Sequence, residues 1–150
     1  MTDLLPFLKQ LISAPGLTGY EGAIRRPIEE AWRPLVDEIH VSRLGSLHAL
    51  RRGLAAPPPP SLLLAAHMDA IGLMVSRIVD GFLGVVEVGG LDPRVLPGQM
   101  VTVHARQDLP GMIVQPPADL LPESLGHEDP VPLEHLLVDV GLRPAQTTDP

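Results

Sequence analysis

The composition of this chain limits both its fold and its chemistry. It has 150 residues, 45% of them hydrophobic, with two Phe, one Trp and one Tyr, which suits one domain or two very small ones with an aliphatic core. The chain contains no cysteine, so it has no disulfide framework, and any metal must be held by His, Asp or Glu.

The net charge of −7 is unevenly distributed. Residues 1–72 contain seven basic and seven acidic side chains, whereas residues 73–150 contain four and eleven. Such asymmetry is typical of two modules, or of one solvated acidic face. It argues against nucleic-acid binding, which needs a basic surface. No apolar run reaches the roughly 18 residues of a membrane span, and the N-terminus lacks the basic part of a signal peptide, so we expect a cytoplasmic protein.

The first part of the chain predicts two helices. Apolar residues in 3–13 recur at helical spacing, which indicates a short amphipathic helix. After a loop rich in Pro and Gly, Thr18 and Glu21 have the spacing of a capping box for a second helix. That helix should run to about Trp32, with a kink at Pro27.

The rest of the chain shows two different kinds of strand pattern. Two alternating runs, 36–43 and 47–52, flank a turn and predict a β-hairpin. The run "SLLLAA" at 61–66 is apolar at every position, the pattern of a central strand covered by helices on both faces. Residues 1–72 therefore predict the start of an α/β layered domain. Within 73–150, short β runs separated by Gly, Pro and Asp predict a small barrel or sandwich.

His67 and Asp69 directly follow the apolar run. Residues two apart on an extended backbone point to the same side, so both should project from the carboxyl end of the strand. Ligands bind at that edge in open α/β sheets. Imidazole ligates zinc or cobalt, and a carboxylate often accepts the other ring N–H of a ligating histidine. H-x-D is a short pattern, and the alternative is a structural histidine beside a solvated aspartate.

Longer segments carry a family resemblance. They are, in chain order, "LISAPGLTGYEGAIRRPIEE", "LGSLHAL", "LLLAAHMDAIGLMV", "GFLGVVEVGGLDPRVLPGQMVTVHA", "LPGMIVQPPADLL" and "LEHLLVDVG". In these segments the sequence resembles the tetrahedral-particle metalloaminopeptidases. That family includes glutamyl and deblocking aminopeptidases and proteins labelled cellulase-M or endoglucanase. The resemblance covers nearly the whole chain.

The resemblance implies a fold, a cofactor and partners. The fold is the start of an α/β/α layered metallopeptidase domain, followed by an inserted small β-barrel (PDZ-like) domain that helps assemble a homo-oligomer. The complete site binds two divalent metal ions, zinc or cobalt, and acts on peptides. His67 resembles the first metal ligand, and Asp69 the catalytic carboxylate that supports it. The chain departs from the family pattern at Ala70, Ser46 and residues 116–120.

In the family, the bridging carboxylate, the further ligands and the glutamate base follow the inserted domain. We therefore expect 1–72 to be the N-terminal part of the catalytic domain and 73–150 an inserted dimerisation domain whose closing part is missing. The chain alone should be inactive. The alternatives are a non-catalytic assembly or binding module of the same descent, and a shortened frame without a function of its own.

The remaining candidate residues are interpreted as structural. Two histidines should lie on the hairpin, in surface or packing roles, and three in the β module, far from the site: His40, His48, His104, His127 and His135. Asp139 is also interpreted as structural. No G-x-S-x-G nucleophile motif occurs.

Overall fold

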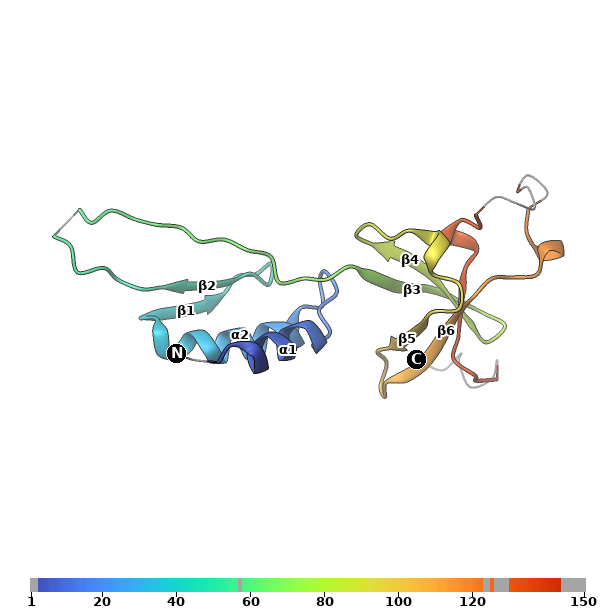
Figure 1. The fold of residues 1–150 in the computed structure, drawn as a ribbon, viewed down its shortest axis with the longest axis horizontal. Helices are drawn as coiled ribbons and strands as arrows, with labels where there is room; N and C mark the ends of the chain where they lie inside the picture. The colour runs from blue at the N-terminus through green and yellow to red at the C-terminus, as the bar shows by residue number, and fades with distance from the viewer. Residues whose placement is uncertain (1–2, 57, 123–124, 126–129, 144–150) are drawn as a thin grey trace. The chain divides into compact units, whose positions relative to one another are not determined.

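A computed structural model describes the chain except for residues 1–2, 57, 123–124, 126–129 and 144–150. The chain divides into two compact units, Met1–Ala70 and Ile71–Pro150, each described here by itself (Figure 1). No helix in the described ranges is both long and apolar enough to cross a membrane.

Unit 1 contains a helix pair and a hairpin, as the sequence predicts. Its elements are α1 (Leu5–Ser13), α2 (Gly22–Trp32), the 3-10 turn Arg33–Leu35, β1 (Glu38–Val41) and β2 (Leu47–Leu50). The two helices contact each other, and α2 also contacts β2. Ile24 and Pro27 are the buried residues of α2, which is continuous across the proline.

The predicted capping box is wrong. The structure shows no side-chain hydrogen bond capping α2, whose first residue is Gly22. Glu21 instead accepts a hydrogen bond from the backbone N–H of Gly19, at 2.7 Å, and so closes its own loop. The Thr18 hydroxyl is engaged elsewhere, as described below.

The predicted central strand at 61–66 is also wrong. This segment is extended but belongs to no strand, and its leucines Leu62, Leu63 and Leu64 are 86%, 86% and 85% exposed. A strand needs a neighbour for its backbone N–H and C=O groups, and none of the described strands pairs with this run. The sheet of unit 1 is therefore the two-stranded hairpin.

Unit 2 is built on one antiparallel sheet. Its strands are β3 (Gly72–Val79), β4 (Phe82–Val88), β5 (Met100–Val103), β6 (Leu109–Val114) and β7 (Leu137–Asp139). Their order is β3-β4-β7-β6-β5, so the short β runs predicted after residue 72 do pair. Since β3 and β5 are the edges, closure into a barrel is not shown by the described strands.

The first hairpin of unit 2 turns through Asp80 and Gly81, both with positive φ, as a type I′ turn requires. The core is aliphatic, as the composition predicts. It consists of Leu83, Val85, Leu96, Ile113, Val131, Leu136 and Val138.

Candidate metal-ligand site

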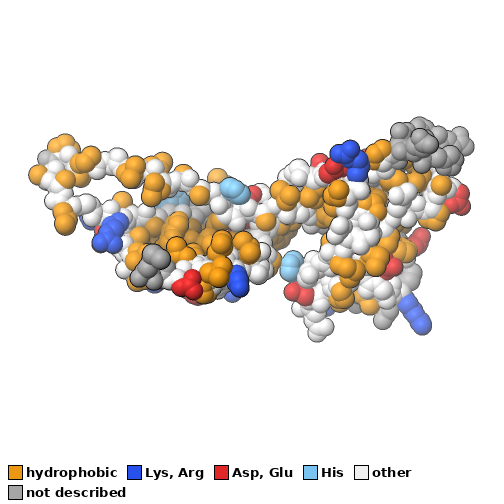
Figure 2. Space-filling model, in the orientation of Figure 1, with side chains coloured by type: hydrophobic (Ala, Val, Ile, Leu, Met, Phe, Trp, Pro, Cys, Tyr) orange, Lys and Arg blue, Asp and Glu red, His pale blue; other side chains and the backbone are white. Residues whose placement is uncertain are grey.

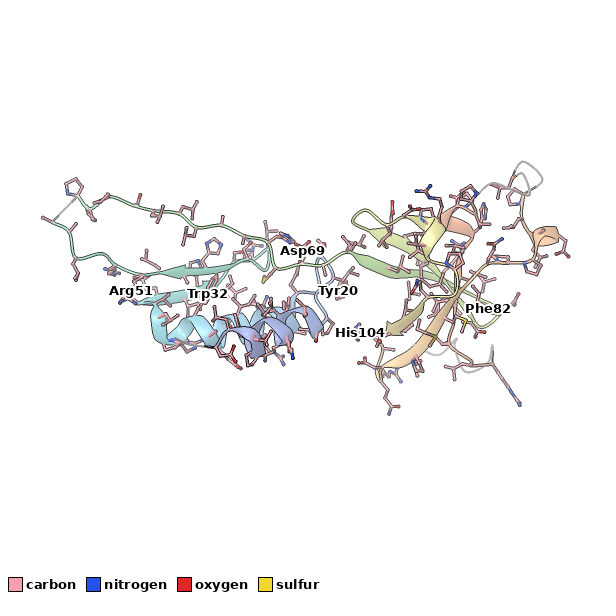
Figure 3. All side chains as sticks on the ribbon, viewed as in Figure 1. Tyr20, Trp32, Arg51, Asp69, Phe82 and His104 are labelled. Atoms are coloured by element: carbon pink, nitrogen blue, oxygen red, sulfur yellow. The ribbon has the colours of Figure 1, made fainter. Side chains whose placement is uncertain are left out.

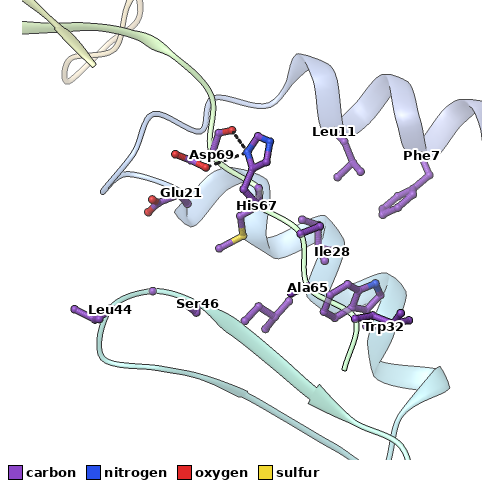
Figure 4. Close-up of a pocket in the computed structure, with 15 residues that line it drawn as sticks. Phe7, Leu11, Glu21, Ile28, Trp32, Leu44, Ser46, Ala65, His67 and Asp69 are labelled. Carbon is purple, nitrogen blue, oxygen red and sulfur yellow. Dashed lines mark hydrogen bonds and ion pairs between the residues drawn. The ribbon is translucent and has the colours of Figure 1, made fainter. Parts of the chain in front are cut away.

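His67 and Asp69 lie at one end of a pocket in unit 1 (Figure 4). The pocket has a volume of about 550 Å³ and is formed by α1, α2, the hairpin turn and the extended segment 64–69. Most of its lining is apolar, including Phe7, Leu11, Ile28, Trp32 and Leu47. The charged and imidazole groups of Glu21, His67 and Asp69 are also part of the lining.

The His67 ring is oriented by Asp69. Its Nδ1 lies 3.1 Å from the Asp69 Oδ1 and 3.1 Å from the backbone oxygen of the same residue. An ionised carboxylate and a carbonyl can only accept hydrogen bonds, so in the neutral ring the proton is on Nδ1. The lone pair of Nε2 is then free, on a side chain that is 85% exposed. The prediction that the two side chains share one side of the backbone is confirmed.

Asp69 has a second partner that the sequence interpretation missed. The hydroxyl of Thr18 donates a hydrogen bond to Asp69 Oδ2 at 2.6 Å, across 51 residues of chain. This bond is the main reason that the pKa of Asp69 is lowered; partial burial opposes the shift, and the hydrogen bond with His67 adds to it. A carboxylate that accepts hydrogen bonds is favoured in its ionised form. Figure 3 labels Asp69 on the extended segment.

A short parallel contact holds the two segments together. The backbone N–H of Ala70 donates to the carbonyl of Gly16 at 2.7 Å, and Leu17 and Ala70 form an isolated β-bridge. Gly16 also packs closely on α2, because a Cβ there would lie 2.8 Å from Cγ2 of the buried Ile24. The backbone thus brings the Thr18 side chain to Asp69.

A metal ion fits this site as a partner of one imidazole. His67 presents a free Nε2, which is the state that a ligating histidine needs. The part of the chain that the structure describes contains no group of three or more His, Cys, Asp or Glu that could hold a metal ion. The described residues of unit 1 therefore offer one imidazole hydrogen-bonded to a carboxylate, and not a complete metal site.

The other predicted residues have different surroundings. The rings of His40 and His48 stack across the hairpin with centroids 4.8 Å apart. His104 pairs with Asp108 at 3.0 Å, and His135 lies beside Glu134. His127 is outside the described residues. Asp139 accepts a hydrogen bond from the backbone N–H of Gly141, which agrees with a structural role.

Comparison with known proteins identifies the family. The sequence model of the M42 glutamyl aminopeptidase family matches residues 45–149. The chain belongs to the M42 family. The resemblance indicated by the sequence motifs is thereby confirmed, and it extends beyond the segment that holds His67 and Asp69.

Individual M42 relatives agree with this assignment. The lysyl aminopeptidase of Pyrococcus furiosus is 34% identical over 89% of this chain and 38% of its own length. The crystal structure of a TET aminopeptidase from Thaumarchaeota archaeon SCGC AB-539-E09 has a TM-score of 0.81 at 30% identity, over 93% of this chain and 39% of that one.

A Pyrococcus horikoshii TET1 peptidase, described as able to assemble into a tetrahedron or a large octahedral shell, has a TM-score of 0.77 at 29% identity. That match covers 99% of this chain and 44% of the peptidase. The chain thus spans less than half the length of each of these relatives.

Proposed function

We propose that this chain is the N-terminal part of a metal-dependent aminopeptidase that removes N-terminal residues from peptides. In this proposal His67 is a metal ligand, and Asp69 is the carboxylate that supports it. The observation that carries the proposal is the His67–Asp69 pair, whose hydrogen bond leaves Nε2 free, in a chain of the M42 family.

Each residue has a defined part in this proposal. Asp69 accepts a hydrogen bond from the Nδ1–H of His67, which fixes the tautomer and makes Nε2 a better electron-pair donor to a cation. The resemblance implies two ions, zinc or cobalt, in a complete site. A divalent ion at such a site supplies Lewis-acid polarisation of the peptide carbonyl.

The proposed architecture has two parts. Residues 1–72 belong to the catalytic domain, and 73–150 belong to an inserted PDZ-like β-barrel domain that contributes to a homo-oligomer. The antiparallel sheet of unit 2 is compatible with the barrel, and the tetrahedral and octahedral assemblies described for the TET1 relative support the oligomer. A cytoplasmic location stays a prediction.

Zinc binding tests the role of His67. The chain should bind zinc weakly, since one imidazole leaves most of a tetrahedral shell to water. His67→Ala should lower the affinity by at least about 10-fold, and Asp69→Asn by about 10-fold or more, because loss of a supporting partner typically costs about 10–100-fold. The affinity is measured by competition with a chromogenic chelator.

His48→Ala is the matched control, because His48 is also an exposed imidazole of unit 1 but lies on the hairpin. This variant should bind zinc as the unmodified chain does. Equal binding by the chain and by His67→Ala would contradict the proposal. So would a loss of binding in His48→Ala alone, which would assign the zinc to the stacked pair.

The chain by itself should have no aminopeptidase activity. The described residues provide no group of three or more metal ligands, and the glutamate of the pocket lining, Glu21, is held by the backbone N–H of Gly19. A positioned general base typically contributes about 10²–10⁴-fold in rate. The test is incubation with zinc or cobalt and an aminoacyl chromogenic amide. Turnover that His67→Ala abolishes would show that this chain contains further ligands, and the first to test would be His104, His127 and His135.

A further inference from the structure

We infer that Thr18 is a positioning residue for the metal ligand, acting through Asp69 on the His67 ring. The inference rests on the proposed function in one respect, namely that His67 binds metal. The hydrogen bonds that carry it are independent of any metal.

The geometry connects three side chains in series. Thr18 Oγ1 donates to Asp69 Oδ2 at 2.6 Å, and Asp69 Oδ1 faces His67 Nδ1 at 3.1 Å. The two oxygens of one carboxylate are thus held by two different groups. The terminal torsion of an aspartate is broad, so a carboxylate held only at Oδ1 can rotate and weaken its contact with the imidazole. The second hydrogen bond restricts that rotation.

The backbone holds Thr18 in place independently of its hydroxyl. The loop containing Thr18 is joined to the site segment by the Ala70 N–H to Gly16 carbonyl bond and by the Leu17–Ala70 bridge. Thr18 is itself exposed. Replacing its hydroxyl with a methyl group of similar size therefore removes one hydrogen bond and leaves the loop connected.

A structural role for Thr18 in capping α2 is the competing explanation. The spacing of Thr18 and Glu21 suggests such a cap, but no side-chain hydrogen bond caps this helix. In the structure the Thr18 hydroxyl donates to the carboxylate of Asp69. Loss of the hydroxyl should consequently alter the His67 ring and leave the helices unchanged.

The test measures the His67 tautomer in the metal-free chain of 150 residues, by long-range ¹H–¹⁵N correlation, with His67→Ala used to assign the signals. The unmodified chain should show the Nδ1–H form. Thr18→Val should show a mixture with increased Nε2–H, because the Asp69 carboxylate is then free to rotate and only the backbone oxygen of Asp69 still holds the Nδ1 proton. Thr18→Ser should restore the Nδ1–H form. Thr102→Val, which removes an exposed hydroxyl from β5 of unit 2, is the matched control and should change nothing.

Zinc affinity provides a second readout. Thr18→Val should bind zinc about 10-fold more weakly than the unmodified chain, at the lower end of the effect of losing a supporting group, and Thr18→Ser should bind normally. An unchanged tautomer in Thr18→Val, or no restoration by Thr18→Ser, would overturn the inference. A loss of helical circular dichroism in Thr18→Val would also overturn it, by assigning the hydroxyl to the fold. A failure of the proposed function would give a different result. The His67 tautomer would still change in Thr18→Val, but His67→Ala would bind zinc as tightly as the unmodified chain.

Discussion

At the scale of single residues, two aspartates illustrate different ways of holding a carboxylate. Asp69 accepts a hydrogen bond from the neutral hydroxyl of Thr18, a residue distant in sequence. Asp92 is held by Arg94, two residues away, whose guanidinium contacts both carboxylate oxygens and whose backbone N–H donates to one of them. The charge-assisted contacts of Arg94 are of the stronger kind. The pKa of Asp92 is accordingly lowered to about 2.

Arg94→Met tests the local control of Asp92. The side chain of Arg94 is the largest cause of the low pKa, and its backbone N–H is the next. The variant should raise the pKa of Asp92 from about 2 toward the usual value of about 3.9, while the retained backbone bond keeps it somewhat below. The measurement is ¹³C NMR titration of the carboxyl group.

The sign of the linked stability follows from the lowered pKa. The folded state binds a proton to Asp92 less readily than the unfolded chain does, so the contribution of Asp92 is present above about pH 4 and is lost as the pH falls toward 2. In Arg94→Met the pKa of Asp92 in the folded state lies closer to its value in the unfolded chain, so the pH range over which Asp92 changes the stability should become narrower. Arg77→Met is a suitable control, since Arg77 donates to the carbonyl of Glu134 instead. An Asp92 that titrates near 3.9 in the unmodified chain would contradict this account.

The site was predictable from sequence only as far as its local part. His67 and Asp69 are two residues apart, and the geometry of an extended backbone is sufficient to place them together. Thr18 could not be found in this way, because its partner lies 51 residues away. A local rule assigned Thr18 and Glu21 to a helix cap, but in the structure Glu21 serves the loop at Gly19. The tertiary contact prevailed over the local motif.

At the scale of elements, the accuracy of prediction depended on where each partner lies. Helices satisfy their own backbone, and hairpins pair neighbouring strands, so α1, α2, β1–β2 and β3–β4 were predicted from nearby residues. The run 61–66 shows the limit. Its apolar pattern predicts a strand covered on both faces, but a strand also needs paired neighbours, and no described strand pairs with this run.

The sheet of unit 2 permits a test of packing at Gly111. This glycine is buried in β6, and a Cβ added to it would lie 2.7 Å from Val138 Cγ1 and 3.4 Å from two valine methyl groups of β5. Gly111→Ala should destabilise the chain by about 1–3 kcal/mol, the usual cost of overpacking. The free energy of unfolding is measured by urea denaturation.

Gly90→Ala is the matched control for this substitution. A Cβ at Gly90 has no heavy atom within 4 Å, and its φ is not positive. This variant should be as stable as the unmodified chain, or slightly more so because alanine restricts the unfolded chain. Equal stability of the two variants would show that Val138 and its neighbours move aside at no cost, contrary to the close packing around Gly111.

At the scale of the whole molecule, unit 1 exposes much of its apolar surface. Figure 2 shows hydrophobic side chains gathered over α1 and α2 on the face in view. Leu5, Leu8 and Ile12 of α1 are 54%, 53% and 75% exposed. These residues and the exposed leucines of 61–66 are apolar surface of the kind that recruits partners. The family resemblance implies a homo-oligomer that the inserted β domain helps to assemble, and the exposed apolar residues of unit 1 offer a further place where copies of this chain can associate.

Self-association should depend on the extended segment more than on general hydrophobicity. An extended run with free backbone groups and apolar side chains is a template for pairing with another chain. The unmodified chain should therefore sediment as dimers or larger species at tens of micromolar, a range in which weak interfaces are populated. Leu63→Lys should shift the distribution toward monomer, since a charge on the segment opposes pairing.

Leu54→Lys adds the same charge at a leucine that is fully exposed but lies outside the apolar run, and it should leave the distribution unchanged. A clean monomer in the unmodified chain, or equal effects of the two lysines, would show that 61–66 is not the associating segment.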